Sequence, residues 1–264
     1  TDAGAGALAA RVMVNRLWKH HFGRGLVGTA SDFGTRGDRP THPELLDWMA
    51  GELIRNDWQL KSIHRLIVSS STYLQGNKPN RQAAAIDPDN QLWWRRSARR
   101  LEAEVIRDSL LSVSGKLDST MYGKGSLDEK GPRRSVYLTM KRSRLIPLLQ
   151  LFDAPDMMQS IGKREESTVA PQALTLMNSP IIRDWAGTLA QRIGAGPETP
   201  LDERIRKAYR LALSRSAKAS EIGSMTAFIA AQTQSRGGDA KAATAAFQDF
   251  CHVLLCMNEF VYVD

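Results

Sequence analysis

The sequence contains little cysteine and no long hydrophobic run. Its two cysteines, Cys251 and Cys256, lie five positions apart in a segment with helical periodicity. On a helix they face different directions, so they neither pair easily with each other nor form a zinc site without further ligands at short spacing. No apolar run reaches the roughly 18 residues that a membrane-spanning helix needs. The sequence therefore predicts neither a disulfide scaffold, nor a zinc module, nor a membrane span.

The motifs of several familiar enzyme classes are missing as well. The chain contains none of the patterns GxGxxG, GxxxxGK[ST], HExxH, GxSxG and CxxCH. Nucleotide binding by a glycine-rich loop, zincin chemistry, the esterase nucleophile elbow and covalent haem attachment all lack their usual sequence support. We therefore expect no metal and no cofactor in this chain.

The charge is unbalanced, with 36 Lys and Arg against 28 Asp and Glu and a formal net charge of +8. The excess is concentrated between residues 130 and 144, where no acidic residue occurs. Guanidinium groups hold phosphate, sulfate or carboxylate through paired hydrogen bonds, so these bases are candidates for binding an acidic ligand. A solvated or internally paired face is the alternative, and nucleic acid is less favoured because aromatic residues do not interleave with the bases. The candidate binding residues here are Arg133, Arg134, Lys141, Arg142 and Arg144.

A second group of charged residues lies on a helix predicted at 101–113. Glu104, Arg107 and Asp108 share one face at spacings of three and four, and Arg100 would reach Glu104 in the same way. This pattern is more typical of ion pairs that lock helices together than of a catalytic dyad. Carboxylates beside arginine have lowered pKa values and make poor general acids. We count Glu104, Arg107 and Asp108 as further candidates for the binding site.

The first quarter of the chain holds four of the five histidines. A glycine-rich polar segment, 31–40, lies between two predicted helices, and loops of this kind often carry functional groups. Imidazole beside carboxylate could serve as a general acid or base, with His21, Asp32, Arg36 and His42 as candidate catalytic residues. A structural role is the stronger alternative, because His42 lies within a capping box formed by Thr41 and Glu44.

Apolar periodicity predicts a mainly α fold, an irregular multi-helix domain with one small β pairing. Alternating apolar residues at 134–140 give the clearest strand pattern, and we expect this strand to pair with residues 259–263. The loop at 194–200 divides a main domain, 1–193, from a helical subdomain, 201–264, which we expect to pack on the same core. The remaining helices are predicted at 44–55, 60–71, 145–152, 171–177, 180–193, 201–213, 220–232 and 242–257, after a first helix ending near His21.

Several of these strings resemble one known family along almost the whole chain. They include RVMVNRLWKHHFGRGLV, SDFGTRGDRPTHPELLDWMA, RRLEAEVIRDSLLSVSGKLD, RRSVYLTMKR, STVAPQALTLMNSP and MNEFVYVD. In this order they resemble the planctomycete-specific C-terminal domain, domain-of-unknown-function family 1553. The resemblance runs from about Arg11 to Asp264, and the family has no established catalytic residues to transfer to this chain.

The resemblance implies a biological context. Members form the C-terminal part of large exported proteins of planctomycetes, behind a cytochrome-c-like domain, so haem is expected only on a neighbouring domain. The first residues, TDAGAG, look like a cut inside such a longer protein, for which we expect export to the periplasm or cell surface. The expected partners are the preceding domains and an acidic or sulfated polysaccharide, which the chain would position. The alternative is a carbohydrate-directed hydrolase or oxidoreductase that uses the histidine-rich first quarter, and the third hypothesis is nucleic-acid binding.

Overall fold

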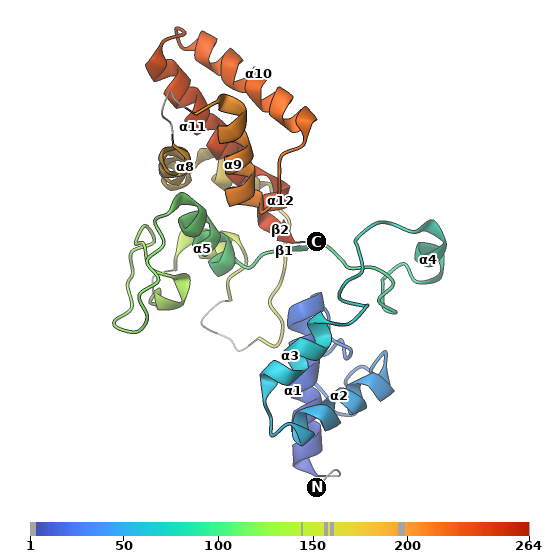
Figure 1. The fold of residues 1–264 in the computed structure, drawn as a ribbon. Coiled ribbons are helices and arrows are strands. Elements are labelled where there is room, and N and C mark those ends of the chain that lie inside the picture. The colour runs from blue at the N-terminus through green and yellow to red at the C-terminus, as the bar shows by residue number, and fades with distance from the viewer. Residues whose placement is uncertain (1–3, 144, 156–157, 159–160, 195–198, 264) are drawn as a thin grey trace. The chain divides into compact units, whose positions relative to one another are not determined.

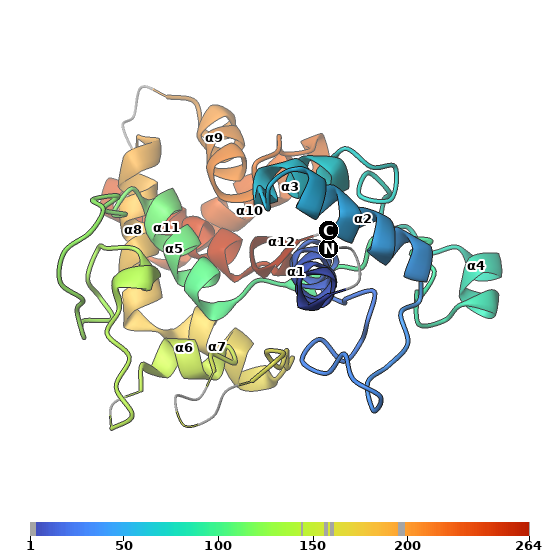
Figure 2. The ribbon, with the colours of Figure 1, turned by 90° about the horizontal axis from the view of Figure 1, so that it is seen from below.

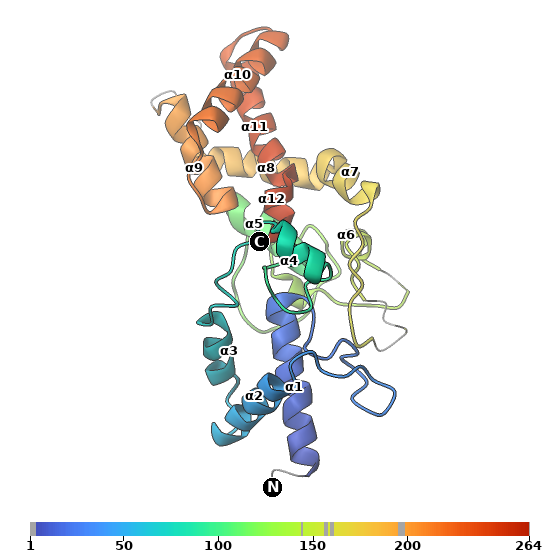
Figure 3. The ribbon, with the colours of Figure 1, turned by 90° about the vertical axis from the view of Figure 1, so that its right-hand side faces the viewer.

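A computed structural model describes residues 4–143, 145–155, 158, 161–194 and 199–263. The mainly α fold is confirmed, with one small two-stranded antiparallel sheet in the described residues. The chain divides into two compact units, Thr1–Arg99 and Arg100–Val263, each with its own hydrophobic core. Figure 1 labels most of the elements along the chain, and Figures 2 and 3 also label α6 and α7. In the part of the chain that is described, no helix combines the length and the hydropathy that a membrane crossing requires.

Three helices make the core of the first unit, where α2 and α3 pack against α1 (Figure 3). Their apolar faces bury Val14, Trp18, Leu53 and Ile63. The helix α1 ends because Gly23 takes a left-handed conformation, with φ of 84°. The helices of this unit are α1 (Ala5–Phe22), α2 (Pro43–Arg55), α3 (Leu60–Val68) and α4 (Arg81–Ile86).

The side chain of Asn15 fixes the chain that follows α1. Its Oδ1 accepts a hydrogen bond from the Val27 N–H at 2.8 Å, and its Nδ2 donates to the Val27 carbonyl at 3.1 Å. Asn15 is fully buried. A Cβ at Gly25 would lie 2.7 Å from the Asn15 amide, so only glycine fits at this position without a steric clash.

The second unit packs around α8 and α11, with α5 against α8 (Figure 2). The core includes Leu110, Trp185, Leu189 and Phe250. Its helices are α5 (Ala103–Ser114), α6 (Pro147–Leu151), α7 (Ala170–Asn178), α8 (Pro180–Ile193), α9 (Leu201–Leu213), α10 (Ala219–Ser235), α11 (Ala240–Cys256) and α12 (Asn258–Val261). A 3-10 turn, η1, spans Ser135–Tyr137.

The small sheet has a different partner from the one expected. The strand β2 (Tyr262–Val263) pairs with β1 (Arg99–Arg100), and the Leu101 N–H donates to the Val261 carbonyl at 2.8 Å. The predicted strand at 134–140 is instead η1 and extended chain, with one isolated bridge between Ser126 and Leu138. The apolar residues that alternate in this segment, Val136, Leu138 and Met140, line a cavity beside α5 instead of one face of a strand.

The units divide at Arg99/Arg100, and residues on both sides of the 194–200 loop share one core because α9 and α11 contact α8. Residues 195–198 of that loop lie outside the described residues. The expected Thr41 cap is wrong: α2 begins at Pro43, so the N-cap residue is His42, and it makes no side-chain cap hydrogen bond.

Candidate functional site

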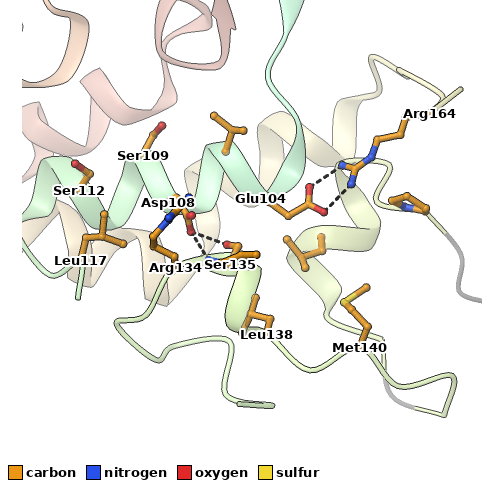
Figure 4. Close-up of a pocket in the computed structure, with 14 residues that line it drawn as sticks. Glu104, Asp108, Ser109, Ser112, Leu117, Arg134, Ser135, Leu138, Met140 and Arg164 are labelled. Carbon is orange, nitrogen blue, oxygen red and sulfur yellow. Dashed lines mark hydrogen bonds and ion pairs between the residues drawn. The ribbon is translucent and has the colours of Figure 1, made fainter. Parts of the chain in front are cut away.

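A cavity lies beside α5 in the second unit (Figure 4). Its volume is about 710 Å³. One wall is α5 and the other is the segment that carries η1. The apolar residues that line it are Val105, Leu117, Val136, Leu138, Met140, Leu149 and Pro155. The polar ones are Glu104, Asp108, Ser109, Ser112, Ser135, Arg134 and Arg164.

Helical spacing brings the α5 side chains to this cavity. Glu104, Asp108 and Ser112 follow one another at intervals of four residues, so they lie on one face, one turn apart. Ile106 and Leu110 on the opposite side are fully buried in the core of the second unit. The amphipathic pattern of α5 therefore orients a polar row toward the cavity.

Arg107, which lies on α5, holds in place the cavity wall formed by the segment that carries η1. Its side chain is 0% exposed, and its Nη2 donates to the carbonyls of Gly131 at 2.6 Å and Glu129 at 3.0 Å. Its Nη1 donates to the Arg133 carbonyl at 2.9 Å and to Ser135 Oγ at 3.1 Å. Burial lowers the pKa of Arg107, while the nearby carboxylates, Asp108 first, oppose that shift. One buried guanidinium thus satisfies backbone carbonyls that lack a regular β-ladder.

Asp108 completes this support. Its Oδ1 accepts hydrogen bonds from the Ser135 N–H and from Ser135 Oγ, both at 2.7 Å. Figure 4 shows Ser135 held against Asp108 at the cavity wall. Because the Arg107 guanidinium lies 3.5 Å from the same oxygen, the charge of Asp108 is balanced within the protein.

Glu104 is also neutralised, although not by the expected partner. Arg164 binds it through two hydrogen bonds of 2.7 and 2.9 Å. Burial alone would raise the pKa of Glu104, but hydrogen bonds from Arg164 and from its own backbone hold that pKa below the ordinary 4.5. The expected pair of Arg100 with Glu104 is wrong, because α5 begins at Ala103 and Arg100 lies in β1, where it binds Asp153.

Arg134 is the lining residue whose charge is left uncompensated. Its neighbour in sequence, Ser135, is fixed to α5, whereas the Arg134 side chain is exposed. Within the described residues it makes no hydrogen bond or ion pair with the protein. A guanidinium in this state can bind a carboxylate or a sulfate.

The other predicted basic residues have different surroundings. Arg133 stacks on the Tyr137 ring at 3.8 Å and donates to the carbonyls of Thr120, Tyr122 and Lys124, so it serves to hold the loop. Lys141 and Arg142 are exposed and do not line the cavity. Arg144 lies outside the described residues.

The four candidate catalytic residues belong to the first unit. Asp32 Oδ1 accepts a hydrogen bond from the Gly34 N–H at 2.9 Å, Arg36 is exposed, and His42 Nδ1 lies 3.0 Å from Thr41 Oγ1. His21 Nε2 lies 2.8 Å from His64 Nδ1. Within the described residues, no hydrogen bond or ion pair joins any two of the four candidates.

Sequence reasoning found part of the cavity and missed part. Glu104, Asp108 and Arg134 line the cavity, and Arg107 stabilises its wall through hydrogen bonds to the backbone. Arg164 was missed because it is distant in sequence from Glu104 and lies in a segment without periodicity. Among the described residues, no group of three or more His, Cys, Asp or Glu lies together in a way that could hold a metal ion.

Comparison with known proteins adds the family. The sequence model of the PSD1 family, described as a protein of unknown function (DUF1553), matches residues 3–229. The chain belongs to this family. The DUF1553 match confirms the resemblance over residues 3–229 and includes every residue that lines the cavity, whereas the string MNEFVYVD lies beyond it. No curated protein matches the chain, and no solved structure does either.

Proposed function

We propose that this chain is a non-catalytic binding module that positions an acidic carbohydrate, a polysaccharide bearing carboxylate or sulfate groups, in the cavity beside α5. The proposal includes the setting expected of the family: the C-terminal part of a longer exported protein with a neighbouring haem-binding domain. The observation that carries the binding role is the uncompensated Arg134 at the edge of a mostly apolar cavity.

The charges around the cavity favour an anionic ligand. Glu104 is bound by Arg164, and Asp108 by Ser135 and Arg107, so neither carboxylate is left to repel an anion strongly. Arg134 then provides the unmatched charge. Its paired N–H donors fit the two oxygens of a carboxylate or a sulfate.

The rest of the lining suits a sugar ring. Aliphatic side chains such as Val136 and Leu138 can pack against the C–H face of a pyranose, and burial of that surface contributes about 25 cal/mol per Å². The hydroxyls of Ser109 and Ser112 can donate to and accept from sugar hydroxyls.

The state of the carboxylates favours binding over hydrolysis. Glycoside hydrolysis generally requires one carboxylic acid that is protonated at working pH. The pKa of Glu104 is held low, which favours its ionised form. The Oδ1 atom of Asp108 is already engaged as the acceptor of two hydrogen bonds from Ser135. The hydrolase or oxidoreductase hypothesis built on His21, Asp32, Arg36 and His42 stays a prediction, as does nucleic-acid binding.

The test compares two arginine variants by calorimetric titration with a sulfated and a neutral oligosaccharide of equal length. Arg134→Gln removes the charge at the cavity, and Arg142→Gln removes an exposed charge that does not line it. Because a hydrogen bond to a charged group contributes about 1.5–3 kcal/mol, Arg134→Gln should weaken binding of the sulfated ligand roughly 10- to 150-fold. Arg142→Gln should change it less than about threefold.

Three outcomes contradict the proposal. The wild-type chain could fail to bind the sulfated ligand, or bind the neutral one equally well. The two variants could also weaken binding equally, which would indicate a diffuse basic surface. Retention of duplex DNA that falls steeply with salt would favour the nucleic-acid hypothesis instead.

A further inference from the structure

A pair of histidines in the first unit joins two helices. His21 comes from the last turn of α1 and His64 from the middle of α3, and both are half-buried. The 2.8 Å between His21 Nε2 and His64 Nδ1 is a hydrogen-bond distance. One ring must donate and the other accept, so the contact requires at least one neutral imidazole.

The groups around the pair are cationic or aromatic. The Tyr73 ring meets His21 edge-on with centroids 5.7 Å apart, and the Arg96 guanidinium lies 4.2 Å from the centroid of Tyr73. His20 on the same helix and Arg99 add positive charge near His21.

Two carboxylates of α2, the helix that packs against both α1 and α3, have other partners. The α2 carboxylates Asp47 and Glu52 bind Arg11 and Arg55. Within the described residues, neither ring of the pair makes an ion pair with a carboxylate. Protonation of both rings would therefore place two positive charges at hydrogen-bond distance without compensation.

We propose that the His21–His64 hydrogen bond is an acid-sensitive clasp that fastens α3 to the end of α1 at neutral pH and is released when both rings carry a proton. The clasp belongs to the first unit and does not depend on the carbohydrate proposed for the second. Its release loosens α3 and the following turn, which carries Tyr73.

The direction of the pH effect follows from the environment of His21. Burial is the largest cause that lowers its pKa below the ordinary 6.5, and the charges of His64, Arg99, Arg96 and His20 lower it further. A base whose pKa is lower in the folded state than in the unfolded state stabilises the folded state. This stabilisation is complete when the pH lies above the unfolded-state pKa. This stabilisation is lost as the pH falls from 6.5 through the lowered value.

Two NMR measurements on the wild-type chain test the clasp without any variant. The ring proton shifts of His21 should titrate below pH 6.5. Amide hydrogen exchange, corrected for its intrinsic pH dependence, should show protection in α3 falling over that same titration. Protection in α11 of the second unit should stay constant. If α3 keeps its protection while His21 becomes protonated, the proposal is overturned.

Matched variants then identify the group responsible. His64→Gln keeps a hydrogen-bonding side chain that cannot ionise, so the loss of α3 protection below pH 6.5 should disappear. The pKa of His21 should also rise in this variant, because a neighbouring positive charge has been removed. His42→Gln changes a histidine of the same unit that contacts Thr41, and it should retain the wild-type acid response. An unchanged acid response in His64→Gln would refute the clasp.

Discussion

Replacement of Arg107 by methionine tests how the cavity wall is held. Methionine keeps most of the aliphatic length of arginine and removes all its N–H donors. The carbonyls of Glu129, Gly131 and Arg133 lose their charged partner, and so does Ser135 Oγ. Each such hydrogen bond contributes about 1.5–3 kcal/mol. The total is smaller than their sum, because the 129–133 backbone lies near the surface and regains water. We expect a loss of about 3–5 kcal/mol, typical of a broken buried charge network.

This loss is large compared with the 5–15 kcal/mol or so of stability of a typical domain. Urea unfolding followed by circular dichroism measures it. With a slope of about 1–3 kcal/mol per M, a loss of about 3–5 kcal/mol should lower the unfolding midpoint of the second unit by about 1–5 M. Arg142→Met is the control, since an exposed side chain replaced in the same way should change stability by less than about 0.5 kcal/mol.

The same variant should also disorder the wall that carries Arg134, so binding of the sulfated oligosaccharide should be lost together with stability. A loss below about 1 kcal/mol, the value of one ordinary hydrogen bond, would refute the role assigned to Arg107. In that case the segment would be held by its own turns and by Arg133.

Two further predictions concern buried groups. Asn15→Ala leaves the N–H and carbonyl of Val27 unpaired, so the first unit should lose about 2–4 kcal/mol, and an unchanged thermal unfolding midpoint would contradict this. Burial raises the pKa of Cys251 to about 12 and that of Cys256 to about 11. A disulfide reagent at pH 8 should therefore modify the native chain slowly and the urea-unfolded chain rapidly. A thiol that reacts fast in the native chain would contradict the burial of these two side chains.

Local signals in the sequence predicted the helices well. The bounds of α8 and α9 are those predicted from apolar periodicity. In the structure α8 starts at Pro180 and is followed at its C-cap by Gly194, which has φ of 89°. The short α4 was missed, because a segment that buries no residue leaves no periodic pattern. Its start depends on Asn80, whose side chain accepts hydrogen bonds from Gln82 and Ala83.

The candidate site was only partly predictable, because it depends on contacts between distant positions. Spacing on α5 correctly placed Glu104 and Asp108 on one face. It could not reveal Arg164, which lies 60 residues beyond Glu104. The expected partner Arg100 was wrong because an interval of four residues has meaning only inside a helix, and α5 starts after it.

The way Arg107 holds the cavity wall has a consequence for which positions of that wall can vary in this chain. Three of its acceptors are backbone carbonyls, a group that every amino acid possesses. The arginine therefore constrains the path of residues 129–133 without constraining their side chains. Positions 134, 136 and 138 can then change identity on a wall whose course is kept. Substitutions at these positions can therefore change the lining of the cavity while Arg107 preserves the course of its wall.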